Sequence, residues 1–363
     1  MRDESNASNA NQSNMKSSEP NAKQISLSDS QNRKSVAEVV KAEIDHYCET
    51  AYNDGHRWHL GASLIGHECE RYLWYVFRWC FSPKFNGRMQ RLFNRGHREE
   101  ERYIEWLKGI GFQVWTDDLD NNRLWYNSAL EVYKILPVGE DFVDEWLDAE
   151  DVSRDEKHVK RAKADGVKFP QYRMSGCNGH FGGSLDGIAK FPPQSGIDVP
   201  VLLEFKTNCT GAGFSKLFTD GIEMHKPQHF TQTSTYGFKY GLDYCLYLNI
   251  NKNDDDLYVE VAKLKHEVGE QAELKAERII VSQKPPAKLS ANPTFFKCKH
   301  CDAKDLCHGD AFAEKNCRSC INARPAENAE WYCDEHCDII PRDVVPKACD
   351  SYSPITAISN DDV

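Results

Sequence analysis

The sequence predicts an α/β protein in which a mixed sheet is flanked by helices, with a cysteine-rich metal module at the C-terminal end. The run Val201-Leu202-Leu203 is typical of a central strand buried on both faces. The segments YCLYLNI and LYVEVAKL flank a turn-forming Asn/Asp run and predict an antiparallel hairpin that extends the same sheet. The metal module is indicated by the cysteines, because eight of the fourteen fall between Cys298 and Cys349.

Composition limits the classes of protein to consider. A chain of 363 residues allows two or three structural units. The formal net charge of −11 argues against a generally basic nucleic-acid-binding protein, so contact with DNA requires a local basic patch. The sequence lacks a long apolar run and an N-terminal signal pattern, so we expect an intracellular, cytoplasmic protein with no membrane partner. In that compartment, C-x-x-C pairs indicate metal sites more than disulfides.

We expect three parts along the chain. Residues 1–35 are rich in Ser, Asn, Gln and Lys and contain no aromatic residue, which is typical of a disordered tail. The core is expected at residues 36–310, with a charged insertion at about 114–175. Residues 311–363 are expected to form a zinc-ribbon-like extension.

Two helical segments come before the sheet. A helical pattern starts at Val36, and Ser63 is the expected N-cap of a helix, LIGHECERYLWYVFRWC, that contains Cys69. A further helix is expected from about Gly87 to Leu107, where apolar residues recur at helical spacing. Glu100 falls on that apolar face, and a carboxylate there is costly unless it is paired or bound to metal.

The same helix carries a basic stripe. Its members are Arg88, Arg91, Arg95, Arg98 and Arg102. A basic stripe beside an active site binds phosphates, and we assign DNA contacts to Arg91, Arg95 and Arg98. The alternative is that the stripe only forms ion pairs with Glu99 and Glu101.

The stretch from Gly182 to Tyr236 concentrates the acidic and basic groups needed to hydrolyse a phosphodiester. Glu204 and Lys206 alternate with apolar residues on a predicted strand, so their side chains face the same way. If the strand that starts near Asp186 pairs with it, the two carboxylates converge, and they repel each other unless a hard cation such as Mg²⁺ lies between them. Lys206 is then placed to orient the attacking water. The alternative is a solvated strand face with a weak ion pair.

A helix that begins near Pro227 follows this strand, because proline fits the first turn of a helix. Several of its side chains recur at steps of three or four and share one face. They are His229, Gln232, Thr233, Tyr236 and Tyr240. This mixture of polar and apolar groups favours a helix packed against a functional site.

The order of these motifs resembles the PD-(D/E)XK nuclease superfamily, and within it the RecB-type branch with an iron–sulfur cluster, which includes CRISPR adaptation exonucleases, AddB and phage exonucleases. The matching motifs are Gly183-x-x-Asp186, Glu204-x-Lys206, Gln232-x-x-x-Tyr236 and Gly96-x-x-x-Glu100. Leu185 stands where the strict motif has proline. The resemblance implies a restriction-endonuclease-like fold for the core.

The resemblance also implies roles for the site residues. It implies that Mg²⁺ or Mn²⁺ is held by Glu100, Asp186, Glu204 and the backbone carbonyl of Phe205. Lys206 would position the attacking water. Gln232 and Tyr236 would orient the phosphate and the nucleophile.

The cysteines divide into two groups. Cys298, Cys301 and Cys307 supply three thiolates, one short of a complete site, and Cys69 is the obvious fourth. The resemblance implies a [4Fe–4S] cluster at these positions, and zinc at the same thiolates is the alternative. Cys317, Cys320 and Cys333 have zinc-ribbon spacing, with His336, Cys337 and Cys349 as candidates for the last Zn²⁺ ligand. Resemblance to extensions of phage nucleases favours Cys349, and such a module shapes DNA entry or binds a partner protein.

Together these features predict a metal-dependent deoxyribonuclease. We expect an exonuclease that hydrolyses single-stranded DNA or DNA ends, in a setting such as phage DNA recombination or processing. One alternative is a nucleic-acid-binding or scaffold protein whose metal sites are structural. Another is an endonuclease on the same fold.

Overall fold

The computed structural model describes residues 28–53, 55–140, 146 and 148–355. Residues 1–27 of the expected tail lie outside this range, and helix α1 (Ser30–Ala51) begins before the expected start at Val36. The helix starts there because Asp29 caps it: the Asp29 carboxylate accepts a hydrogen bond from the Gln31 backbone N–H at 2.8 Å. Among the described residues, no helix is long and apolar enough to cross a membrane.

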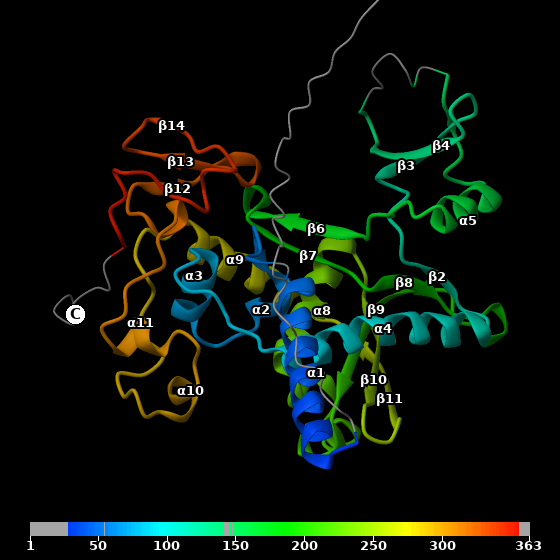
Figure 1. Ribbon diagram of the computed structural model, residues 1–363. Coiled ribbons are helices and arrows are strands. Elements are labelled where there is room, and N and C mark those ends of the chain that lie inside the picture. The colour runs from blue at the N-terminus through cyan, green and yellow to red at the C-terminus, as the bar shows by residue number, and fades with distance from the viewer. Residues whose placement is uncertain (1–27, 54, 141–145, 147, 356–363) are drawn as a thin grey trace, which may run out of the picture.

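A five-stranded sheet with the order β11-β10-β9-β8-β2 lies at the centre of the molecule (Figure 1). Its strands are β2 (Gln113–Trp115), β8 (Gly187–Lys190), β9 (Pro200–Asn208), β10 (Tyr244–Asn251) and β11 (Leu257–Lys263). Strand β9 runs parallel to β10 and antiparallel to β8, which confirms the expected mixed sheet. The predicted hairpin is β10 with β11, and the predicted central strand is β9, where Val201, Leu202 and Leu203 have no exposed surface.

Helices cover both faces of this sheet. On one face, α4 (Gly87–Gly109) packs Tyr103 and Leu107 against the core that contains Leu203. The Tyr103 hydroxyl also donates a hydrogen bond to the Lys206 carbonyl at 2.7 Å. Leu202 points the other way, into the core that α8 (Pro227–Tyr240) and α9 (His266–Val281) share. Side chains that alternate along β9 therefore pack into two different cores, one on each face of the sheet.

The segment expected to form one helix after Ser63 forms two, so that prediction was wrong. Helix α2 (Ala62–Ile65) ends at Gly66, and α3 (Glu70–Phe77) begins after Cys69, which caps it. Gly66 lies so close to α8 that a Cβ at this position would stand 2.7 Å from the Gln228 Cα. Because the chain turns at this contact, Cys69 lies outside the helix and its sulfur accepts the Tyr72 N–H at 3.4 Å.

A small unit occupies the place of the expected insertion, at the upper right of Figure 1. It comprises β3 (Asn122–Asn127), β4 (Val132–Pro137), β5 (Glu150–Asp151) and α5 (Glu156–Ala164). Leu124, Val152 and Ala162 form its own core. The first residues assigned to the insertion belong to β2, and the last belong to β6 (Arg173–Gly176), which pairs with β7 (Phe181–Ser184). Strand β7 also pairs with β1 (Leu60–Gly61).

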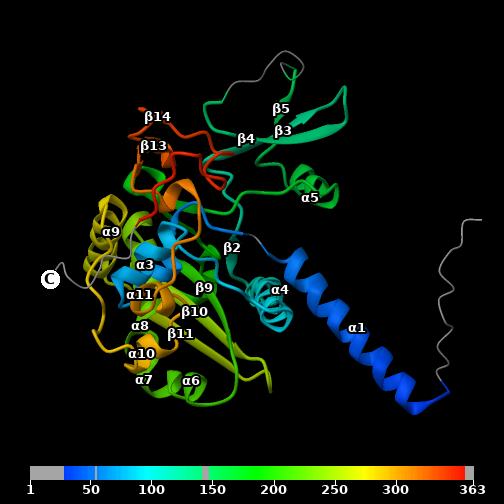
Figure 2. The same cartoon turned by 60° about the vertical axis from the view of Figure 1, so that its left-hand side comes forward.

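The C-terminal part packs beside α3 (Figure 2), where α11 (Lys304–His308) is its neighbour in both views. The remaining α-helices and strands are α6 (Ala212–Ser215), α7 (Leu217–His225), α10 (Phe296–Lys299), α11 (Lys304–His308), β12 (Ala323–Pro325), β13 (Trp331–Cys333) and β14 (Asp338–Ile339).

Arg318 has no exposed surface, and its guanidinium lies 4.6 Å from the Phe77 ring, 4.4 Å from Trp79 and 4.6 Å from Trp331. This aromatic cage joins the two ends of the chain.

The crossing of α8 and α9 generates the first prediction. A Cβ at Gly269 would lie 2.4 Å from the Ser234 carbonyl oxygen and 2.6 Å from the Phe238 Cβ. We expect Gly269→Ala to lower the free energy of unfolding by about 1–3 kcal/mol, because neither atom can move without shifting a helix. Gly109→Ala is the control, since nothing lies within 4 Å of its added Cβ. Urea denaturation of both variants is the measurement, and equal stability would contradict the close packing.

Candidate active site

The pairing of β8 with β9 brings two carboxylates together. Gly187 pairs with Leu203, which places Asp186 beside the middle of β9. The Asp186 Oδ2 accepts a hydrogen bond from the Phe205 backbone N–H at 2.7 Å. Glu204 is fully buried on the same strand. Asp186, at the start of β8, therefore lies close to Glu204 in the middle of the paired strand β9.

Lys206 is the cation of this group. Its Nζ donates to the Glu204 Oε1 and, at 3.3 Å, to the Phe205 carbonyl oxygen. Burial alone lowers the pKa of Lys206, but the carboxylates of Glu204 and Asp186 outweigh it and raise the pKa. The ammonium group stays charged at neutral pH. The Phe205 carbonyl also faces the site, since Lys206 reaches it.

Glu100 joins the site from α4. Gly96, one turn before it, lies against β9, with 4.0 Å between its added Cβ and the Thr207 hydroxyl oxygen. Burial and the nearby Asp186 raise the pKa of Glu100 to about 7. Burial also raises the pKa of Glu204 to about 7 and raises that of Asp186. Three carboxyl groups thus share one ammonium group, and the excess negative charge costs free energy.

Helix α8 closes the site from the other face of the sheet. The Gln232 amide nitrogen lies 3.4 Å from the Glu204 Oε2 and 3.5 Å from the Tyr236 hydroxyl. Tyr236 in turn packs on Gly183, where an added Cβ would lie 2.5 Å from the hydroxyl oxygen. Any larger residue at position 183 would displace the Tyr236 side chain. The motifs G-x-x-D and Q-x-x-x-Y are therefore in direct contact.

A second polar layer lies beside these residues; sequence reasoning placed His229 on the helix face towards the site but did not assign Tyr247 or Asn249 to it. Tyr247 pairs with Glu204, and Asn249 pairs with Lys206, across the parallel strands β10 and β9. The Tyr247 hydroxyl lies 2.8 Å from the His229 Nδ1 and 3.1 Å from the Asn249 Nδ2. The alternation Tyr247-x-Asn249 inside an apolar strand was the available signal.

A cationic group lies along β7, and it too was missed. Burial lowers the pKa of His59, and the guanidinium groups of Arg57 and Arg173 lower it further. Arg173 is paired with Ser184, two positions before Asp186, and it makes no ion pair with a described carboxylate. Arg57 bonds the Ser63 hydroxyl at 3.2 Å. These residues come from a loop and from β6, so no periodicity in the sequence marks them.

The basic stripe of α4 faces away from Glu100. At 3.6 residues per turn, its arginines stand about half a turn from Glu100. Arg91 pairs with Asp45 of α1, and Arg95 lies 3.7 Å from Glu99 and donates to the Lys252 carbonyl at 3.1 Å. Arg98 is exposed on the same side. Much of the stripe therefore forms ion pairs within the protein.

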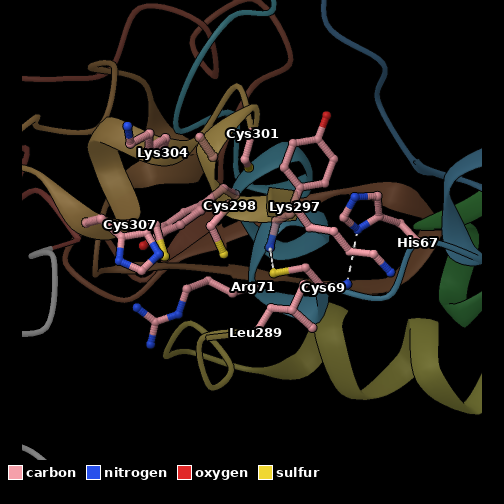
Figure 3. Close-up of a pocket in the computed structure, with 13 residues that line it drawn as sticks. His67, Cys69, Arg71, Leu289, Lys297, Cys298, Cys301, Lys304 and Cys307 are labelled. Atoms are coloured by element: carbon pink, nitrogen blue, oxygen red, sulfur yellow. Dashed lines mark hydrogen bonds between the residues drawn. The ribbon is translucent and has the colours of Figure 1, made fainter. Parts of the chain in front are cut away.

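The first cysteine group surrounds one cavity of about 30 Å³, shown in Figure 3. Its lining includes Cys69, Cys298, Cys301 and Cys307, which come from the start of α3, from α10, from its C-terminal flank and from α11. Burial raises the pKa of Cys301 and Cys307, and the nearby Cys69 adds to both shifts. Residues far apart in the sequence are thus close in space.

The second group lies in the C-terminal module. Burial, together with the nearby thiols of Cys349, Cys320 and Cys333, raises the pKa of Cys317 to about 11. His336 borders the group, since its Nε2 lies 3.6 Å from the Cys349 sulfur. Cys337 is exposed and donates to the Asp334 carbonyl. Of the candidates for the last ligand, Cys349 is the one that raises the pKa of Cys317.

These groups match metals by donor type. In the part of the chain that the structure describes, no three His, Cys, Asp or Glu side chains converge closely enough to hold one ion as they stand. The carboxylates beside the Phe205 carbonyl are nevertheless hard oxygen donors, the ligand type that Mg²⁺ and Mn²⁺ prefer, and a cation would relieve the repulsion between them. The two cysteine groups supply soft sulfur donors, which suit iron–sulfur clusters and Zn²⁺.

No family model matches the chain, and no curated protein matches its sequence. Among solved structures, it is similar to LHK-Exo in complex with dAMP, with 13% identity, a TM-score of 0.34, and coverage of 61% of this chain and 86% of that chain. It is similar to SSO0001, with 11% identity, a TM-score of 0.33, and coverage of 77% and 98%. It is also similar to an alkaline exonuclease (LHK-Exo) from Laribacter hongkongensis, with 15% identity, a TM-score of 0.23, and coverage of 34% of this chain and 63% of that chain.

The layer beside the site predicts a pH dependence of stability. Burial, with Lys206 and Lys226 nearby, lowers the pKa of His229 to about 3. The unfolded chain therefore takes up a proton on this ring below pH ~6.5 that the folded protein excludes, so stability falls as the pH drops from ~6.5 towards 3, by at most about 1.4 kcal/mol per pH unit.

We expect His229→Gln to flatten this pH profile by about one proton. The free energy of unfolding, measured by urea denaturation across that pH range, tests it. Gln271→Asn, a change at an exposed residue of α9 that does not titrate, is the control and should keep the wild-type slope. A wild-type slope in His229→Gln would show that the ring is not held neutral.

Proposed function

We propose that the protein is a metal-dependent deoxyribonuclease, and specifically an exonuclease that hydrolyses single-stranded DNA or DNA ends. One observation carries the proposal. Glu100, Asp186 and Glu204 arrive from α4, from the start of β8 and from β9 at one place, where Lys206 is the shared cation. Buried charge of this kind costs stability, so it is retained where chemistry needs it.

The residues that would hold Mg²⁺ or Mn²⁺ are Glu100, Asp186, Glu204 and the Phe205 carbonyl. Such an ion supplies a Lewis acid for the phosphate and activates water near neutral pH. The donor set fits because three carboxyl groups exceed the single ammonium charge of Lys206.

The protein's own groups orient the reaction. Lys206 directs an ammonium N–H into the site and so holds the attacking water and the charge that grows on the phosphate. Gln232 lies between Glu204 and Tyr236 and fixes both side chains. Beside them, Tyr247 and Asn249 stand across from Glu204 and Lys206 and exclude bulk water from the sheet side of the site.

The DNA backbone has a place to bind beside these groups. Arg57, His59 and Arg173 lie along β7, which leads directly to Asp186. A guanidinium without an internal carboxylate partner is available to phosphate, and Arg173 meets that condition among the described residues. A local cationic group of this kind would let a protein with a formal net charge of −11 bind the negatively charged DNA backbone. Phage DNA recombination or processing is a setting that needs such an activity.

We further propose a [4Fe–4S] cluster at Cys69, Cys298, Cys301 and Cys307, and Zn²⁺ at Cys317, Cys320, Cys333 and Cys349. The cavity in Figure 3 and its four thiols support the first site. Both sites are structural in this proposal, since a link from Cys69 to α10 closes a loop of more than two hundred residues. The C-terminal module would then present a fixed surface to DNA or to a partner protein.

Asp186→Asn and Lys206→Ala are each expected to abolish DNA cleavage, because one removes an ion ligand and the other removes the charge that orients the water. Cleavage of end-labelled linear and circular DNA, single- and double-stranded, with Mn²⁺ or Mg²⁺ is the measurement. It also separates exonuclease from endonuclease activity, since only an endonuclease cuts circles.

The matched control for these variants is Asp198→Asn, whose side chain is 91% exposed. We expect it to cleave at the wild-type rate, and we expect all three variants to keep the wild-type melting temperature or exceed it. Wild-type cleavage by either Asp186→Asn or Lys206→Ala would refute the assignment of the site.

The two cysteine groups predict separate metal contents. Protein purified without oxygen should be brown and contain about four irons and one zinc per chain. Cys301→Ala should lose the iron and keep the zinc, while Cys320→Ala should do the reverse. Elemental analysis and the visible spectrum measure both. A colourless preparation that contains two zincs and retains full activity would refute the cluster and leave the proposed nuclease activity intact.

A further inference from the structure

Helix α4 carries an exposed aromatic residue, Phe93, to which the proposed catalytic site gives no role. The Phe93 side chain is 41% exposed, although it lies on a helix that packs against the central sheet. Its aromatic neighbour is Phe85, itself 42% exposed, with ring centroids 5.0 Å apart in an edge-to-face pair. Two large apolar side chains thus leave a ring face in solvent, at a cost of roughly 25 cal/mol per Å² relative to burial.

Phe93 points in the same direction as the active-site residues of α4. A contact of α4 fixes the side of the helix that meets the site: Gly96 lies against β9, where an added Cβ would stand 4.0 Å from the Thr207 hydroxyl oxygen. With 3.6 residues per turn, Glu100 stands about 40° from Gly96 around the helix, and Phe93 about 60° from it in the same direction. Phe93 therefore stands about 20° from Glu100, on the side of α4 that faces β9.

The spacing along the helix fits a bound strand. Phe93 lies one turn before His97 and seven positions before Glu100, which is about 10 Å along the axis at 1.5 Å per residue. Stacked bases in one strand are ~3.4 Å apart. A strand whose scissile phosphate lies at the carboxylates would pass Phe93 within about three nucleotides of the cut.

We propose that Phe93, braced edge-on by Phe85, stacks on an unpaired base of the substrate strand beside the catalytic carboxylates. The ligand is a single-stranded nucleobase, because every base has a π-face whereas bases inside a duplex are already stacked. This inference rests on the proposed nuclease function and names its substrate: a single strand, or a duplex end opened by a few pairs. Phe93 then sets specificity and takes no part in the chemistry.

The test measures binding without cleavage, in the Asp186→Asn variant and, separately, in the otherwise wild-type protein with Ca²⁺. The probe is a short fluorescent oligothymidylate, with a blunt duplex as the comparison. Phe93→Ala should weaken single-strand binding by about 5- to 150-fold, since stacking on one aromatic side chain contributes about 1–3 kcal/mol per base. Binding to the blunt duplex should change by less than about twofold.

Two further variants sharpen the test. Phe93→Trp should restore binding, and its fluorescence should be quenched when the oligonucleotide stacks on it. Phe312→Ala is the matched control, because Phe312 is 86% exposed in the C-terminal part of the chain and belongs to no site described above. It should bind both probes as the unmodified protein does.

Oligonucleotides with a single abasic position locate the contact. Moving the abasic position along the strand should weaken binding at one or two positions, and Phe93→Ala should abolish that sensitivity. Equal binding by Phe93→Ala and its parent protein would overturn the proposal, as would equal losses for single strand and duplex. A change in oligomeric state without a change in DNA binding would assign Phe93 to a protein contact and also overturn it. Cleavage by the wild-type protein is measured separately, so the proposed function can survive either result.

Discussion

The structure depends on holding three carboxyl groups and one ammonium group where β8, β9, α4 and α8 meet. Lys206 binds Glu204 and faces Asp186, and Glu100 completes the group from the helix above. Each surrounding element is fixed by a close contact: Tyr103 ties α4 to the Lys206 carbonyl, and Tyr236 of α8 packs directly on Gly183. The central sheet and its two helices thus serve to keep like charges together.

A second constraint joins the ends of the chain. The cysteine groups bring Cys69 to α10 and α11, and the aromatic cage around Arg318 fixes the C-terminal module on α3. Arg78 is also fully buried and donates to the Ala323 carbonyl at 2.7 Å. Burial lowers the pKa of Arg318 well below its usual range, so this contact is costly unless the module is fully folded. The cysteine groups and the cage therefore lie at the same junction.

Much of this could be predicted from the sequence, because the main signals are local. The buried run before Glu204, the hairpin around residues 251–256 and the proline that starts α8 each determine one element by pattern alone. The rest depends on tertiary contacts. Gly66 divides a predicted helix only because α8 crosses it, and the Arg57–Arg173 group assembles from segments that no periodicity connects. The arginines of α4 face away from Glu100, as their spacing already implies, but only the tertiary structure shows that Arg91 pairs with Asp45 of α1.

The most direct measurement is a Mn²⁺ titration followed by electron paramagnetic resonance, which detects the ion as it leaves solution. It compares the wild-type protein with Glu204→Gln, which removes a buried charge, and with Asp198→Asn, which removes an exposed one. If the carboxylates form an ion site, the wild type and Asp198→Asn bind Mn²⁺ equally, and Glu204→Gln loses that binding. Equal binding by all three proteins, or none by the wild type, would contradict a metal-dependent active site at this place.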